Sequence, residues 1–105
     1  MEQPNHSYID QLAAGNKAFK KKLLTVIKDE FPEEKAIYLK NIAAKNHKEA
    51  AENVHKIKHK ISILGLEKSY EIAVAFENNL KEDDTTLRTE FEAVLNVISE
   101  YLITL

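Results

Sequence analysis

The chain lacks cysteine and has only two glycines and two prolines among its 105 residues. Without cysteine it can form no disulfide, no thiolate nucleophile and no sulfur-ligated metal site. The scarcity of glycine and proline removes the turn residues that closely spaced strands need, while the helix-favouring residues Ala, Leu, Ile, Glu and Lys are abundant. The composition therefore predicts an all-α fold.

Long apolar runs and a dominant charge are also absent. No apolar stretch approaches the roughly 20 residues of a membrane span, and the polar start at residues 1–5 lacks the layout of a signal peptide. Fifteen basic and seventeen acidic residues are interspersed and leave a net charge of −2. We therefore expect a cytoplasmic monomer that binds neither membranes nor nucleic acid. The basic run Lys20-Lys21-Lys22 is interpreted as a solvated helix face, with binding to an anionic surface as the alternative.

Apolar residues, 44% of the sequence, suffice for one core, and no linker or repeat interrupts residues 1–105, so the sequence predicts a single domain. Apolar spacings of three and four predict a short helix ending near Gly15, a second from Asn16 to Phe31, and a third from Pro32 to Asn46. A kinked continuation of the second helix through Pro32 is the alternative. Further helices are predicted at 47–64, at 67–81 and from Thr85. Short connections force neighbouring helices to alternate in direction, which predicts an antiparallel up-and-down four-helix bundle with an additional short N-terminal helix.

One histidine lies off the apolar face of the helix predicted at 47–64. On a helical wheel, His55 falls about 140° from the centre of that face. Four side chains share its polar side: Glu52, Lys58, His59 and Ser62. Imidazole is a competent neutral nucleophile near neutral pH, and Lys58 lies one turn away, where its ammonium can meet an anion. This pair suits phosphate chemistry.

The segment Val54-His55-Lys56-Ile57-Lys58, with Gly65 ten residues after the histidine, resembles the signature of histidine-containing phosphotransfer (HPt) domains. In that signature the phosphorylated histidine is followed by any residue, an aliphatic residue, lysine and usually glycine. A second glycine ends the helix. The order of helices is also similar over most of the chain. The family's glycine after the lysine is replaced here by His59, which puts the docking geometry in doubt.

The resemblance implies a phosphocarrier rather than an enzyme. His55 would carry the phosphoryl group, Lys58 would offset its charge, and Gly65 would end the helix. The partner would be the receiver domain of a response regulator or hybrid histidine kinase, which supplies the magnesium ion, so that the chain itself binds no cofactor. No phosphate-cradling loop or kinase motif is present, which argues against ATP binding. A docking surface is predicted at Ile9, Leu12, Ala13 and Ile63, although these residues equally suit a cap on the bundle end.

Two other functions remain open. Glu52, His55 and His59 have the helical spacing of metal ligands, although no further ligand is evident and we predict no metal site. Alternatively, the histidine helix docks a receiver domain without accepting phosphate, as an adaptor. We assign no chemistry to His6, to His47 or to the four tyrosines, and interpret Asp83 and Asp84 as complementing a helix dipole.

Overall fold

The computed structural model describes residues 2–105, so Met1 of the polar start lies outside it. Within this range the chain forms five helices and no strand, as the composition predicts. The helices are α1 (Ser7–Ala13), α2 (Lys17–Ala43), α3 (His47–Ile63), α4 (Glu67–Lys81) and α5 (Arg88–Ile103). No helix in this part of the chain is long and apolar enough to cross a membrane.

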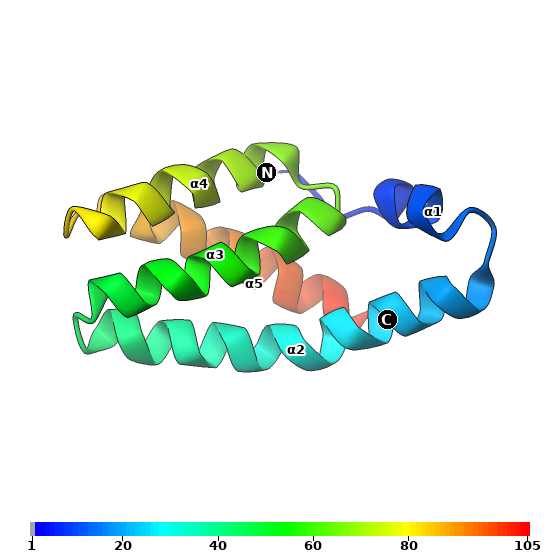
Figure 1. Cartoon of the computed structure of the whole chain (residues 1–105), viewed down its shortest axis with the longest axis horizontal. Helices are drawn as coiled ribbons and strands as arrows, with labels where there is room; N and C mark the ends of the chain where they lie inside the picture. The colour runs from blue at the N-terminus through cyan, green and yellow to red at the C-terminus, as the bar shows by residue number, and fades with distance from the viewer. Residues whose placement is uncertain (1) are drawn as a thin grey trace.

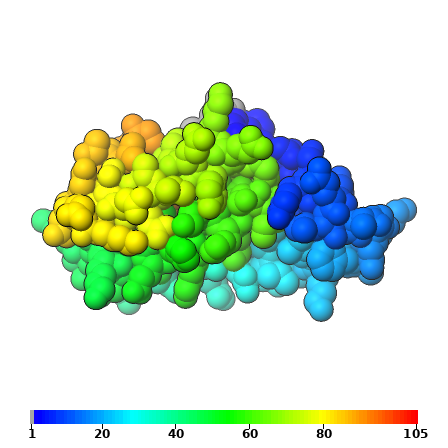
Figure 2. Space-filling view, turned by 45° about the horizontal axis from the view of Figure 1, so that its top comes forward, coloured from blue at the N-terminus to red at the C-terminus, as the bar shows by residue number. Residues whose placement is uncertain are grey.

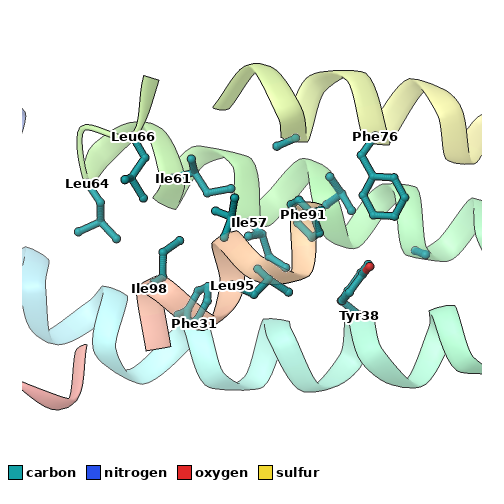
Figure 3. Packing of buried hydrophobic residues seen from close by; sticks show 14 of the residues in the cluster. Phe31, Tyr38, Ile57, Ile61, Leu64, Leu66, Phe76, Phe91, Leu95 and Ile98 are labelled. Atoms are coloured by element: carbon teal, nitrogen blue, oxygen red, sulfur yellow. The ribbon is translucent and has the colours of Figure 1, made fainter. Parts of the chain in front are cut away.

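Successive long helices reverse in direction, and each contacts the next along the chain (Figure 1). Helix α5 lies behind α3 in this view and also contacts α2, while α1 packs against the N-terminal half of α2. The core between the helices includes an aromatic cluster, with Tyr38 from α2, Phe76 from α4 and Phe91 from α5 (Figure 3). Their ring centroids are 5.2 to 6.3 Å apart. The cluster joins three helices that are distant in sequence.

The predicted boundary at Pro32 is wrong, and its alternative holds. Helix α2 runs through Pro32 as one helix of 27 residues. Figure 1 shows the N-terminal half of α2 inclined to its C-terminal half. Proline lacks an N–H and its ring crowds the preceding turn, which bends a helix without ending it when the flanking turns are held by packing. Phe31 and Tyr38, on either side of the proline, are both buried and provide that packing.

The other predicted helix ends are close to those observed. Asn16 caps α2, since its Oδ1 accepts the N–H of Phe19 at 3.0 Å. The last helix begins at Arg88 rather than near Thr85. Asp84 explains the delay, because its Oδ1 accepts both the N–H and the hydroxyl of Thr86 and holds these residues in a turn. Asp83 belongs to the end of α4, with a φ of 57°, rather than to a helix start.

The N-terminal segment is tied to the turn between α3 and α4. The Asn5 N–H donates to the Leu64 carbonyl at 2.8 Å, and the Asn5 side chain lies directly over Gly65. Glu2 accepts the N–H groups of Lys68 at 3.1 Å and Ser69 at 2.8 Å. N–H groups in the first turn of a helix have no acceptor within the helix itself, so Glu2, a residue distant in sequence, caps α4.

Candidate functional site

His55 lies on α3 at its edge with α4, and its side chain is 54% exposed. The wheel's prediction that it faces solvent is confirmed. Residues on the opposite side of the same helix, including Val54, Ile57 and Ile61, are completely buried. Burial of that stripe fixes the rotation of α3 and thereby the direction in which His55 points.

The partner of His55 is a carboxylate on the neighbouring helix. Its Nδ1 lies 3.1 Å from Oε2 of Glu77, whose side chain is only 11% exposed. An ionised carboxylate can only accept a hydrogen bond, so the proton of the neutral imidazole sits on Nδ1 and the lone pair on Nε2. Glu77 thus selects both the orientation and the tautomer of the ring.

Glu77 is also the partner of Lys58. The Lys58 Nζ donates to Oε1 of Glu77 at 2.9 Å, and the Lys81 Nζ lies 3.6 Å from Oε2. Burial by itself raises the pKa of the Glu77 carboxyl, but hydrogen bonds from Lys58 and His55, with their charges, outweigh it and hold the pKa below its ordinary value. The carboxylate is therefore ionised at neutral pH. Lys58, predicted to neutralise a phosphate, is paired with this carboxylate instead in the unmodified protein.

The predicted neighbours of His55 are placed differently from one another. The His59 ring meets the His55 ring edge to face, with centroids 5.2 Å apart. Glu52 lines a groove of about 600 Å³ beside His55, whereas Ser62 is exposed and does not line it. The groove also contains three lysines, namely Lys48, Lys56 and Lys81. Figure 2 looks onto the face where the green side chains of α3 meet the yellow side chains of α4.

The side chains of the metal-binding alternative are not brought together around one point. Among residues 2–105, no group of three His, Cys, Asp or Glu side chains is arranged to hold a metal ion. Glu52, His55 and His59 therefore share a helix face without converging on one point, since the Nδ1 of His55 is turned toward α4 and Glu77.

The predicted docking surface is corrected at two of its four residues. Ile9 and Ala13 are buried in the core, so they cap the end of the helical assembly and cannot meet a partner. Leu12 is 47% exposed, and Ile63 is partly buried against the core. Helix α1 has only 7 residues and one apolar side, and that side, with Ile9 and Ala13, packs against the rest of the protein.

Gly65 ends α3 as predicted. It has a φ of 77°, its N–H donates to the Ser62 carbonyl, and the next residue, Leu66, donates to Ile61. This pair of bonds is a Schellman motif. A Cβ at position 65 would lie 2.5 Å from the Asn5 side chain, so glycine is needed for space as well as for conformation.

Sequence reasoning missed Glu77, a buried residue of α4. The position did carry a signal. Ala73 and Leu80, on the same face of the helix, are buried, and a carboxylate among such residues requires a cationic or hydrogen-bonding partner.

Two other histidines also have partners: His47 Nδ1 lies 3.0 Å from Asp83 Oδ1, and His6 bonds the Tyr101 hydroxyl.

Comparisons of the sequence with protein-family models and curated proteins, and of the structure with solved structures, found no significant match.

Proposed function

We propose that this chain is a cytoplasmic histidine phosphotransfer protein in which His55 takes a phosphoryl group from the aspartyl phosphate of a receiver domain and passes it on. In this proposal α2 to α5 constitute the antiparallel four-helix bundle of such a module. The observation that carries the proposal is the half-exposed His55 ring, whose Nδ1 is held by the largely buried carboxylate of Glu77 at 3.1 Å. A histidine that only covers the surface has no need of a partner carboxylate, and burying a carboxylate is costly, so the pairing of Glu77 with His55 favours a functional role for this histidine.

The proposed transfer follows from this geometry. The Nε2 lone pair attacks phosphorus, the bond from phosphorus to the aspartyl oxygen breaks, and the aspartate leaves with the electron pair. The ring keeps its Nδ1 proton and becomes positively charged. Glu77 accepts that proton's hydrogen bond and stabilises the charge, as a carboxylate does for an imidazolium in a catalytic triad. The reverse reaction returns the phosphoryl group to a second receiver.

Lys58 has two successive roles in this proposal. Before transfer, its ammonium neutralises Glu77 at 2.9 Å. After transfer, the positive imidazole ring satisfies Glu77, which lets Lys58 turn toward the phosphoryl oxygens one helical turn from its own backbone. The magnesium ion belongs to the receiver domain, and no group on this chain is assigned to hold it.

An adaptor that docks a receiver without accepting phosphate is the second candidate. The edge-to-face contact between His59 and His55, at 5.2 Å, favours it. The second imidazole stands where the resembled family usually has glycine, and it occupies space beside the His55 ring.

Phosphotransfer from a labelled, phosphorylated receiver domain in the presence of magnesium tests the proposal. We expect acid-labile label on the wild-type chain and on the His59→Ala and His47→Ala variants, and none on His55→Ala. His47→Ala is the matched control because His47 also has a carboxylate partner, Asp83, but lies outside the site. Label lost only in His59→Ala would move the acceptor to His59. Docking without label on any variant would establish the adaptor.

A further inference from the structure

A second surface lies between α2 and α5, on helices that do not carry His55. Two adjoining hollows, of about 430 and 350 Å³, share Lys28 in their linings and together form what we call the α2–α5 groove. Its walls expose aliphatic side chains: Leu39 is 37% exposed and Ile103 is 82% exposed. In Figure 1 the C-terminus lies close to α2, where Leu105 and Lys28 line the same hollow.

Five lysines line the groove, and three of them follow a regular spacing. Lys21, Lys28 and Lys35 recur every seven residues, which places them on one face of α2 along roughly 21 Å of helix. Among the described residues, Lys21 and Lys28 have no carboxylate partner. Lys35 donates to two uncharged groups, Ser99 Oγ at 2.9 Å and Asn96 Oδ1 at 3.4 Å. No aspartate or glutamate is found in either lining.

This charge is local rather than a property of the whole molecule. Residues 16–28 contain five lysines and no acidic residue, whereas the complete chain has a net charge of −2. The basic run noted in the sequence, Lys20-Lys21-Lys22, divides between surfaces. Lys20 and Lys21 both line the groove, with Lys20 also paired to Asp10 of α1 at 2.6 Å, whereas Lys22 lies outside it.

We propose that the α2–α5 groove binds an acidic amphipathic helix of a partner protein. The apolar ridge of such a helix would fill the groove, and its carboxylates, spaced by seven residues, would pair with Lys21, Lys28 and Lys35. The concave shape favours a helix over a membrane, because a planar bilayer would touch the rims and leave the apolar floor unfilled. Heptad spacing of charge beside an apolar seam is the pattern by which helices select oppositely charged helical partners.

The groove and the His55 site use different surfaces. His55 and Glu77 lie where α3 meets α4, and neither residue lines the α2–α5 groove. A partner helix in the groove therefore leaves His55 open. The binding proposed here does not depend on phosphotransfer, and either inference can fail without the other.

A synthetic peptide of three heptads, with Leu at positions a and d and Glu at e and g, provides the probe. Binding to the full isotope-labelled chain is followed by nuclear magnetic resonance and calorimetry at low salt. We expect shifts confined to the groove side of α2 and to the end of α5. The double variant Lys21→Glu/Lys28→Glu should bind at least about tenfold more weakly. The double variant Lys22→Glu/Lys40→Glu is the matched control, with the same charge change on the same helix outside the groove, and it should bind as the wild type does.

Four results would overturn the proposal. One is equal weakening by both double variants, and another is equal binding of a peptide whose leucines are replaced by serine, since either means general attraction of charge. A third is association with phosphatidylserine vesicles but not with the peptide, which would assign the surface to a membrane. The fourth is a dimer of this chain in sedimentation experiments, together with the absence of peptide-induced resonance shifts. This result would assign the groove to a second copy of this chain.

Discussion

At the scale of single residues, Glu77 determines what His55 can do. It is the one buried acidic residue among residues 2–105, and three cationic or ionisable groups converge on it: His55, Lys58 and Lys81. A carboxylate removed from solvent keeps its charge only if such partners compensate the loss of hydration. The same contacts hold the imidazole in one tautomer, so one side chain couples the stability of the α3–α4 edge to the reactivity of Nε2.

Replacing Glu77 with glutamine tests this coupling. The amide can donate as well as accept, so we expect the neutral His55 ring of Glu77→Gln to populate both tautomers, whereas the wild-type ring keeps its proton on Nδ1. Nitrogen chemical shifts of the imidazole report the two forms. Phosphotransfer to His55 should slow by roughly tenfold or more, as for other residues that orient a reactive imidazole. Glu71→Gln, an exposed position on the same helix, is the control. An unchanged tautomer in Glu77→Gln would contradict the assigned role.

At the scale of helices, three helix ends use the same hydrogen-bond pattern with different residues. The residue of positive φ is Lys45 after α2, Gly65 after α3 and Asp83 after α4. In each case it and its successor donate to carbonyls in the last turn of the helix. Only glycine adopts this conformation without steric cost. Asp83 is compensated in part by its contact with His47, whereas Lys45 has no side-chain partner among the described residues.

The helix ends therefore predict opposite effects of two substitutions. Lys45→Gly should raise the free energy of unfolding by about 0.5 to 1 kcal/mol, because it removes left-handed strain at a small entropic cost in the unfolded chain. Gly65→Ala should lower it by about 1 to 3 kcal/mol, from strain and the clash with Asn5. Urea titrations measure both. Adding Asn5→Ala to Gly65→Ala should recover part of the loss. A Gly65→Ala variant as stable as the wild type would contradict the close approach.

At the scale of the whole molecule, stability depends on contacts between segments distant in sequence. The aromatic cluster joins α2, α4 and α5, and Glu2 caps α4 from the N-terminal segment. Burial raises the pKa of Glu2, but hydrogen bonds from the N–H groups of Ser69 and Lys68 outweigh it and lower that pKa, as the contacts of Glu77 do at its own site. These carboxylates make the folded state sensitive to acid.

The direction of the pH effect follows from the lowered pKa of Glu77. Its ordinary value is 4.5, so the stabilisation by ionised Glu77 is complete above that pH and is lost as the pH falls through the lower folded pKa. At neutral pH, Glu77→Gln should be less stable than the wild type by about 1 to 3 kcal/mol, because Lys58 loses its partner. Below pH 4.5 the difference should shrink, because Glu77 of the unfolded chain takes up a proton first, and it should vanish only below the lower folded pKa, where folded wild-type Glu77 is neutral as well. Denaturant titrations over this range measure the difference. A constant difference at every pH would exclude the linkage.

Local patterns were sufficient for much of the fold. Apolar spacing located α3 and α4, Asn16 and Gly65 marked helix ends through their own hydrogen bonds and conformation, and the wheel placed His55 in solvent. These features depend on residues within a few turns of one another. The continuity of α2 through Pro32 did not follow from sequence, because proline breaks or merely bends a helix according to what packs on both sides of it.

The sequence by itself determined the helical class, the exposure of His55 and the end of its helix at Gly65. Only the tertiary structure decided that Glu77 faces His55 and Lys58, that Ile9 and Ala13 are buried, and that Lys21, Lys28 and Lys35 border one groove. Helical periodicity orients each residue about its own axis. Which side chains meet across two helices depends on how those axes are rotated and spaced, and the packing of the shared core sets both.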